Sequence, residues 1–251
     1  KKNTAPFNSQ LKIYKDKFFI IDYNNILRAY SIKDGNEIWK IKTENSLIRS
    51  QTKLSMVIIQ NRIYFNNYSG DISSVDIETG ELLWQTPTQN NLIKDENFFL
   101  KTSDIVADND ALYFSNNKNQ FFSLDIKTGF LNWQQKVNSN LRPTLIDDYI
   151  FTISLSGHLI IIAKKSGNII RITDIFEKFK NKKINKIKPT GFIIGNNNVY
   201  LSTSYGRLMV IDIESSEVVN IIKVDNNKIA RPIVLNKKMF ITTDSSIIKL
   251  N

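Results

Sequence analysis

The chain has 251 residues, 41% of them apolar and 23% charged, which is enough to bury a sizeable core in one or two domains. Cysteine is absent, which excludes disulfide bonds, thiolate metal ligands and cysteine nucleophiles. The net charge of +10 would favour anionic partners, but the lysines are spread over strand edges and turns along the whole chain, so we expect no nucleic-acid partner.

Short strands rich in aromatic and β-branched residues recur along the chain. In chain order they are Phe18–Ile21, Ile63–Phe65, Leu112–Phe114, Tyr149–Phe151, Val199–Leu201 and Met239–Ile241. A turn and a second strand follow each of them, the second strands being Leu27–Ile32, Ile72–Ile77, Phe121–Ile126, Leu159–Ala163, Leu208–Ile213 and Ile247–Leu250. Each copy therefore predicts a β-hairpin.

The turns of these hairpins set the period of a repeat. They are centred on Asn25, Gly70, Asn119, Gly157, Gly206 and Ser245, at intervals of 45, 49, 38, 49 and 39 residues. This period corresponds to one four-stranded sheet with its turns. The three glycines suit a left-handed backbone conformation, which would strain a residue with a Cβ atom.

A second turn follows each hairpin, at Asp34-Gly35, Thr79-Gly80, Thr128-Gly129, Ser166-Gly167 and the degenerate Ser215-Ser216. Asp76, Asp125 and Asp212 lie four residues before the glycine position, where a short carboxylate can accept N–H bonds from the turn. We interpret these acids as turn formers rather than catalytic groups.

Tryptophan follows the second turn in three copies, as Trp39, Trp84 and Trp133. Each ring can bury about 150–250 Å² and is predicted to pack between neighbouring sheets. Arg171 and Asn220 occupy this position in later copies, so we expect the last contacts between sheets to be weaker or made differently.

A further strand completes each unit, seen after the prolines in Arg142–Ile146 and Arg231–Val234. The predicted fold class is all-β, a β-propeller of four-stranded antiparallel blades with about six repeats, in a single domain over residues 1–251. The last repeat lacks its outer strand, and Ala5–Phe7 could pair at such an edge. Asp174–Phe179 predicts a helical turn between repeats, and the lysines from Lys178 to Lys188 a solvated loop.

The pattern Asp-x-x-Thr-Gly-x-x-x-Trp, from Asp76 to Trp84, resembles the tryptophan-docking repeat of the pyrroloquinoline quinone propeller superfamily. Within it the chain resembles the BamB family, the propeller lipoproteins of the outer-membrane β-barrel assembly machinery. The chain end at Asp244–Asn251 and the insert at Asp174–Phe179 carry this resemblance. So does Ser46–Ser50, which stands where the family has a Leu-x-Leu-Arg loop that contacts its barrel partner.

The resemblance implies a non-catalytic protein-binding scaffold at the periplasmic face of the outer membrane. Its partners would be a BamA-like barrel assembly protein and nascent outer-membrane proteins. The chain starts at Lys1 rather than Met, so we expect an upstream segment, on which a lipid anchor would provide the membrane association.

The partner-binding residues implied by the resemblance are Leu47, Ile48 and Arg49. Leu47 and Ile48 would be apolar anchors, and Arg49 would form charge-assisted bonds to a partner carboxylate. The alternative is an ordinary connection whose apolar side chains turn inward. An acidic pair that the family uses in the same contact does not align securely with Asp95 and Asp104.

Two questions stay open. The BamB ring has eight blades, so either this ring has six, which we favour, or two repeats lie upstream of Lys1. The alternative functions are a quinoprotein-like small-molecule enzyme and a generic protein-interaction propeller. We expect no cofactor and no metal, because the sequence matches neither the cysteine pair nor the carboxylate cluster of the quinoprotein dehydrogenases, and His158 is the one histidine.

Overall fold

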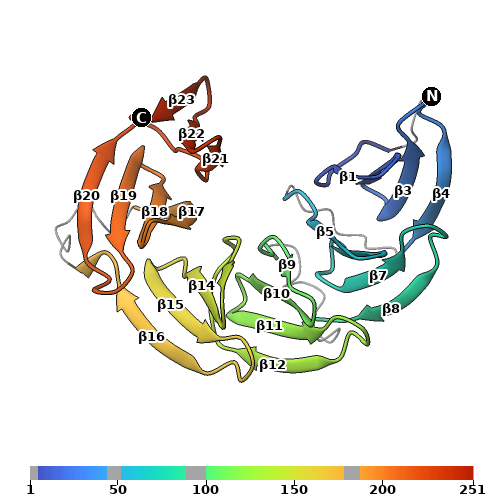
Figure 1. Ribbon diagram of the computed structural model, residues 1–251, viewed down its shortest axis with the longest axis horizontal. Helices are drawn as coiled ribbons and strands as arrows, with labels where there is room; N and C mark the ends of the chain where they lie inside the picture. The colour runs from blue at the N-terminus through green and yellow to red at the C-terminus, as the bar shows by residue number, and fades with distance from the viewer. Residues whose placement is uncertain (1–4, 44–51, 89–99, 178–186, 251) are drawn as a thin grey trace. The chain divides into compact units, whose positions relative to one another are not determined.

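The computed structural model describes residues 5–43, 52–88, 100–177 and 187–250. These residues form six antiparallel sheets, each made of strands that are consecutive in the sequence (Figure 1). The chain divides into two compact units, Lys1–Lys136 and Val137–Asn251, with three sheets in each. Among the described residues there is no α-helix, and hence none long and apolar enough to cross a membrane.

The first unit contains three four-stranded sheets. The first sheet has strands β1 (Lys12–Tyr14), β2 (Lys17–Ile21), β3 (Ile26–Ser31) and β4 (Glu37–Lys42). The second has β5 (Met56–Ile59), β6 (Arg62–Asn66), β7 (Ile72–Asp76) and β8 (Leu82–Thr86). The third has β9 (Val106–Ala107), β10 (Ala111–Asn116), β11 (Gln120–Asp125) and β12 (Leu131–Gln135).

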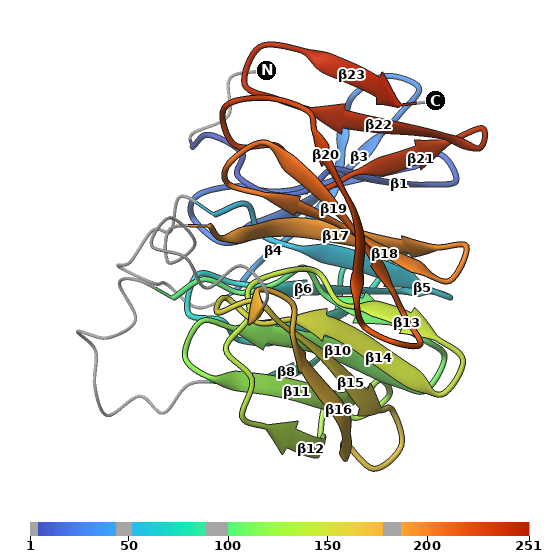
Figure 2. The ribbon, with the colours of Figure 1, turned by 90° about the vertical axis from the view of Figure 1, so that its left-hand side faces the viewer.

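The second unit contains two four-stranded sheets and one three-stranded sheet. The fourth sheet has β13 (Thr144–Ile146), β14 (Tyr149–Ile153), β15 (His158–Ala163) and β16 (Ile169–Asp174). The fifth has β17 (Pro189–Gly195), β18 (Asn198–Thr203), β19 (Arg207–Asp212) and β20 (Val218–Lys223). The sixth has β21 (Ile233–Leu235), β22 (Lys238–Thr242) and β23 (Ile247–Leu250), and it lies beside the fifth (Figure 2).

The predicted hairpins are confirmed, and their turns have the backbone conformation that the sequence indicated. The turn residue has a positive φ in five copies, at Asn25, Gly70, Asn119, Gly157 and Gly206. Asparagine tolerates this conformation better than other residues with a Cβ atom, which explains its use in two copies.

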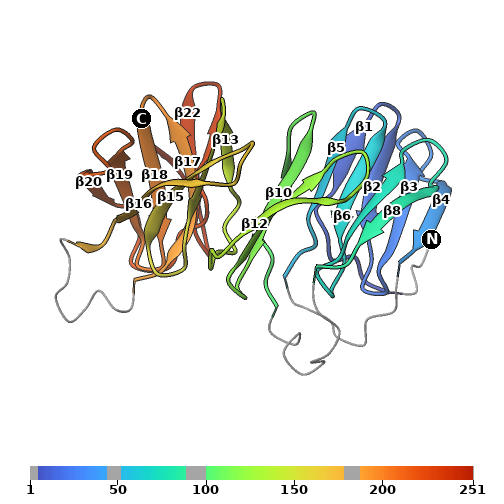
Figure 3. The ribbon, with the colours of Figure 1, turned by 90° about the horizontal axis from the view of Figure 1, so that it is seen from below.

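The core lies between the faces of neighbouring sheets, which stand side by side within each unit (Figure 3). One cluster joins the first and second sheets through residues such as Phe19 and Phe65, and a second joins the second and third through Tyr64 and Phe114. In the second unit, Phe151 of the fourth sheet shares a cluster with Phe192 of the fifth. Neighbouring residues of one strand thus enter different clusters, as Phe65 and Tyr64 do, so both faces of the second sheet are buried.

Tryptophan docking is confirmed for the first two sheets. An ideal Cβ atom on Gly80 would lie 2.6 Å from Cδ2 of Trp39, so the Trp39 ring rests directly on the glycine turn of the next sheet. Trp39 Nε1 also donates a hydrogen bond of 3.2 Å to the carbonyl of Ile77. Trp84 covers Gly129 in the same way, since a Cβ atom there would lie 2.5 Å from the Trp84 ring.

Arg171 takes the tryptophan position in the fourth sheet and makes the contact differently, as expected. Its guanidinium donates to the carbonyl oxygens of Ile213 and Glu214 in the fifth sheet. Polar bonds to a turn thus replace the apolar contact between a ring and a glycine.

One detail of the prediction is wrong, the pairing of the chain start. Phe7 forms a bridge with Asp22, and Ser9 forms one with Leu54, so the start of the chain pairs inside the first unit. It supplies no strand to the sixth sheet, because the polar backbone of residues 5–10 finds its hydrogen-bond partners at the end of β2 and before β5.

The predicted helical turn at Asp174–Phe179 is described only in part, as far as Glu177. Asp174 is the last residue of β16, where it pairs with His158, and its carboxylate accepts the N–H of Phe176 at 2.9 Å. A turn at Ile175 and Phe176 follows, Glu177 has 3₁₀ conformation, and the rest of the predicted helical turn lies outside the described residues. Backbone pairing continues just past the strand, since the N–H of Ile175 donates to the carbonyl of Gly157 at 3.0 Å.

Candidate functional site

The three predicted partner-binding residues, Leu47, Ile48 and Arg49, lie outside the described residues, in the connection from β4 to β5. Asp95 also lies outside them, in the connection from β8 to β9. Asp104 is described, and its backbone carbonyl accepts a hydrogen bond of 3.0 Å from Ser103 Oγ. The flanks of both connections are described, so the site can be built from the residues that anchor them.

The first connection is anchored on both sides by buried hydrogen bonds. Before it, the N–H and the hydroxyl of Thr43 both donate to the carbonyl of Asn25, at 3.1 and 3.2 Å. After it, the side-chain amide of Asn8 donates to the carbonyl of Thr52 at 3.2 Å, and Leu54 N–H donates to the Asn8 carbonyl at 2.9 Å. The start of the chain therefore helps to fix where this connection ends.

Asn66, at the end of β6, holds the flanks of both connections. Its Oδ1 accepts the N–H of Ser55, which follows the first connection, at 2.7 Å. Its Nδ2 donates to Oγ1 of Thr102, which follows the second connection, at 2.7 Å. Asn66 is only 2% exposed, so these bonds are shielded from water and a lost partner would leave a buried polar group unsatisfied.

The turn after Asn66 holds the start of the second connection. The Thr88 hydroxyl donates to the carbonyl of Gly70 at 2.9 Å, and Thr88 N–H donates to Asp71 Oδ1 at 3.4 Å. The other carboxylate oxygen of Asp71 accepts from Nδ2 of Asn67 at 3.2 Å. The buried Asp71 carboxylate is thus used to hold the backbone in place.

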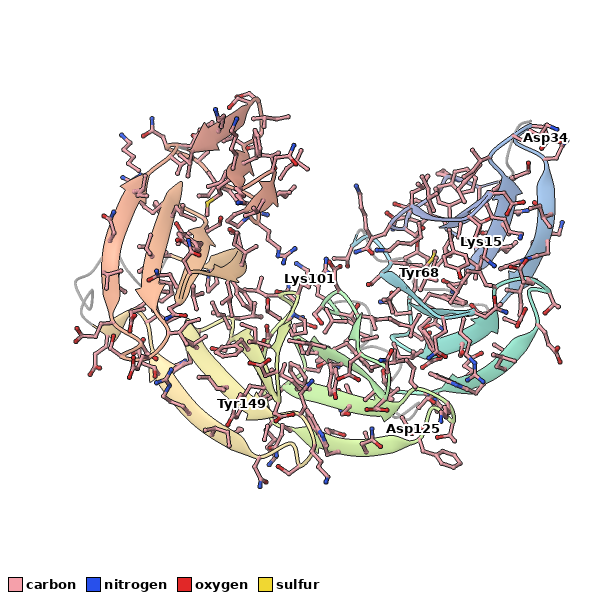
Figure 4. The ribbon with its side chains drawn as sticks, in the orientation of Figure 1. Lys15, Asp34, Tyr68, Lys101, Asp125 and Tyr149 are labelled. Carbon is pink, nitrogen blue, oxygen red and sulfur yellow. The ribbon has the colours of Figure 1, made fainter. Side chains whose placement is uncertain are left out.

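Tyr68, labelled in Figure 4, contacts both the first sheet and the start of the chain. Its ring stacks on Tyr23 of the first sheet, with centroids 5.9 Å apart and planes 13° apart, and its hydroxyl accepts from Asn8 Nδ2 at 3.0 Å. We call the surrounding residues the loop base, which consists of Thr52, Leu54, Asn66, Tyr68, Leu100 and Thr102. The cavity between them measures only about 10 Å³, room for at most one water, so the two flanks are packed together.

The charge beside the loop base is positive. Lys53 and Lys101 are both exposed, one next to each connection. Asp71 is buried and bonded to the backbone and Asp104 is half-buried, so the two lysines are the fully exposed charges described directly beside the loop base. Such a surface suits a partner segment that carries carboxylates.

The acids of the second turns are turn formers, as predicted. Oδ1 of Asp76 accepts the N–H of Glu78 and of Thr79, each at 2.9 Å, together with the Thr79 hydroxyl. The Thr79 N–H and the other donors hold the pKa of Asp76 below its ordinary value. Such bonds stabilise the ionised carboxylate, which is the opposite of what a catalytic acid requires.

Asp125 and Asp212 accept the same set of bonds. Partial burial acts to raise the pKa of Asp125, but the bonds from Thr128 and Lys127 outweigh it, and the pKa is lowered. At Asp212 the Ser215 N–H and hydroxyl, each at 2.8 Å from Oδ1, lower the pKa. The turn chemistry is therefore common to both units.

A larger cavity, of about 350 Å³, lies at the end of β8 beside β11 and β12. The amides of Gln120 and Gln134, the hydroxyls of Thr86 and Thr88, and apolar side chains line it. None of its lining side chains titrates near neutral pH. This cavity offers hydrogen bonds and apolar surface but no general acid or base.

His158 belongs to a hairpin turn. Its Nδ1 lies 3.0 Å from Ser156 Oγ and 3.4 Å from Ser154 Oγ, and Ser154 Oγ also accepts the His158 N–H. Within the described ranges, no three His, Asp or Glu side chains gather where they could hold a metal ion.

Sequence reasoning missed the role of Asn66. The signal available was the pair Asn66-Asn67 directly between an apolar strand and the turn at Gly70, where side-chain amides commonly bond to the backbone. Which backbone groups such an amide reaches depends on chain segments far away in the sequence, here Ser55 and Thr102.

Repeated antiparallel sheets with docked tryptophans define the fold as a β-propeller. Comparison with known proteins narrows this class to one family. The model of the family described as outer membrane protein assembly factor BamB matches residues 1–173, more than half of the chain. The chain belongs to this family. No curated protein sequence matches it.

Two solved structures share the fold. The crystal structure of BamB from Moraxella catarrhalis is 14% identical with a TM-score of 0.67, and the match covers 98% of this chain and 85% of that one. A chain in the crystal structure of a mitotic checkpoint complex is 9% identical with a TM-score of 0.71, and the match covers 99% of this chain and 75% of that one. At these identities the likeness concerns the fold alone.

Proposed function

We propose that this protein is a non-catalytic scaffold of outer-membrane β-barrel assembly, which binds the barrel component of the machinery through the connection that carries Leu47, Ile48 and Arg49. Membership of the BamB family supports the class of function. The observation that supports the site is the pair of hydrogen bonds made by the Asn66 side chain. They hold the flanks of both connections beside the end of β6.

A binding loop loses conformational freedom when it engages a partner, and this loss of conformational entropy reduces the affinity. Here the ends of two connections are held by shielded bonds to Asn66 and by the packed loop base. The described flanks of the two connections lie at adjacent points, with Lys53 and Lys101 beside them, and a partner that carries carboxylates would fit this charge.

We further propose that the scaffold acts at the periplasmic face of the outer membrane and that residues 1–251 act as one propeller domain. Nascent outer-membrane proteins are further partners. The family supports these statements as expectations for experiment.

The proposed contact is tested by reversing one charge. Arg49→Glu would place a carboxylate against the partner's carboxylates, so we expect it to abolish co-purification with the barrel component while the melting temperature stays unchanged. The matched control is Arg142→Glu, the same change at an exposed residue of another connection, which should retain the partner.

Retained binding by the Arg49→Glu variant would remove this connection as the contact. Equal loss in the Arg142→Glu control would instead attribute the effect to net charge. Asn66→Ala adds an independent reading, because it should weaken binding without touching the contact residues.

A further inference from the structure

The cavity of about 350 Å³ beside β8, β11 and β12 exists because two positions of the repeat hold small residues there. Thr86 in β8 holds the position of Ile41 in β4, since each follows the docked tryptophan by two residues. Ile41 packs against the apolar cluster between the first and second sheets. Thr88 holds the position of Ile175 after β16, and Ile175 is buried in the cluster between the fourth and fifth sheets. The two shorter threonine side chains leave space between the second and third sheets.

The walls of this cavity are held in place by hydrogen bonds and by the core. The Thr86 hydroxyl donates to the carbonyl of Gly129 at 2.7 Å, and the Thr88 hydroxyl donates to the carbonyl of Gly70 at 2.9 Å. Phe122, which also lines the cavity, is buried in the cluster between the second and third sheets. The cavity is therefore formed before any ligand binds, and its volume lies in the range of about 300–1,000 Å³ that is usual for ligand sites.

Two glutamine side chains give the cavity its hydrogen-bonding groups. Gln120 Oε1 accepts from Asn116 Nδ2 at 2.8 Å, which orients the Gln120 amide. Gln134 in β12 is exposed, and within the described part of the chain its side-chain amide makes no hydrogen bond. A carboxamide carries both donors and an acceptor, so each of these amides can pair with the N–H and C=O groups of a peptide.

The remaining lining of the cavity is uncharged, and most of it is apolar, with Phe122, Leu124, Leu131 and Pro87. A charged group that entered would lose its water and would meet no opposite charge on these residues, which costs free energy. An uncharged apolar side chain would instead gain free energy from burial against them. The chemistry of the cavity therefore suits an uncharged apolar residue flanked by peptide groups.

We propose that this cavity binds an uncharged apolar residue of the partner protein, whose peptide groups bond to the amides of Gln120 and Gln134. This inference rests on the proposed function. Thr88 lines the cavity and also anchors the start of the second connection through Gly70 and Asp71, so the cavity borders the flanks that we assign to the partner. An apolar anchor that fills a pocket commonly contributes a large share of the binding energy of an interface.

The first test adds a minimal form of this ligand, N-acetyl-phenylalanine amide, to the full chain. We expect saturable shifts of the side-chain amide resonances of Gln120 and Gln134 in NMR spectra, and none with N-acetyl-aspartate amide, which is charged. Gln134→Ala should weaken the affinity about fivefold. The matched control is Gln85→Ala, because Gln85 holds the same position in the second sheet and is not among the described residues that line the cavity. No shift with the uncharged probe, or equal shifts with the charged one, would overturn the proposal.

The second test fills the cavity and measures binding of the periplasmic part of the barrel component. Leu131 is 54% exposed, so Leu131→Trp has room to place its ring over the cavity, and we expect the affinity to fall about tenfold. Leu82→Trp makes the same change at the same position of the second sheet and should bind as the wild type does. Equal affinity of the wild type and the Leu131→Trp variant would overturn this inference and leave the proposed function standing, whereas a wild type that does not bind the component would overturn both.

Discussion

Asp76 and Asp125 perform the same task in consecutive sheets, where one carboxylate oxygen accepts two backbone N–H groups and a threonine hydroxyl. This repeated hydrogen-bond geometry explains why an aspartate recurs at the same turn position in successive sheets without a catalytic role. A turn that depends on a charged acceptor is also sensitive to pH.

The lowered pKa values predict how stability changes with pH. A carboxylate whose pKa is lower in the folded than in the unfolded state stabilises the fold at pH values above its ordinary pKa of 3.8. This stabilisation is lost as the pH falls through the lowered pKa of the folded state. We expect Asp76→Asn with Asp125→Asn to lower the free energy of unfolding at pH 7 by about 1 kcal/mol per site, and by less at pH 3.

Urea unfolding at the two pH values measures this difference. Asp148→Asn serves as the control, since Asp148 is exposed in the turn between β13 and β14 and no second turn depends on it. A loss at pH 3 as large as that at pH 7 would mean that the charge of these acids does not stabilise the turns.

Neighbouring sheets are joined by rings that rest on glycine turns, and the chain contains a matched pair of glycines to test this. Gly80 has φ +76° and lies under Trp39, whereas Gly35 has φ +67° and has nothing within 4 Å of an added Cβ atom. Alanine is strained by the positive φ at both sites, at a cost of about 1–2 kcal/mol. Only at Gly80 does it also collide with a ring.

We expect Gly80→Ala to lower the free energy of unfolding by about 1–3 kcal/mol more than Gly35→Ala, because the ring must move to admit the methyl group. Equilibrium urea unfolding of the two variants gives the difference directly. Equal losses would show that the Trp39 ring can shift without cost and that docking contributes little.

Features encoded by neighbouring residues were predictable from the sequence. The hairpins, the positive φ of Gly70 and Gly157, and the bonds of Asp76 each depend on a few consecutive residues. The partner of Phe7 was not predictable in this way, because an isolated polar segment can pair with any free backbone, and tertiary contacts chose Asp22. The same limit applies to Asn66, whose amide reaches Ser55 and Thr102.

The contact residues themselves were a different kind of prediction. Leu47, Ile48 and Arg49 came from resemblance to the BamB family, and they stay predictions because they lie outside the described residues. What the structure adds is their anchorage, since Thr43 and Thr52 tie that connection to Asn25 and Asn8. The local residue pattern predicts the strands and turns of the sheets. Hydrogen bonds between residues far apart in the sequence determine where the connections leave the sheets.

Across the described residues, five of the six sheets share the positive-φ hairpin turn, and neighbouring sheets within each unit pack through shared apolar clusters. The repeat can vary its docking residue, from Trp39 to Arg171, without losing the fold. The shared turn chemistry therefore belongs to stability, whereas binding is what we propose for the connections around Asn66.

The central claim is that this chain is a scaffold that binds the barrel component of the outer-membrane assembly machinery. Titration calorimetry of the purified 251-residue protein with the periplasmic part of that component tests it most directly. We predict saturable one-to-one binding per chain that weakens as salt is raised, because Arg49 and the lysines beside the loop base contribute charge. No binding by protein that is folded by circular dichroism would contradict the account.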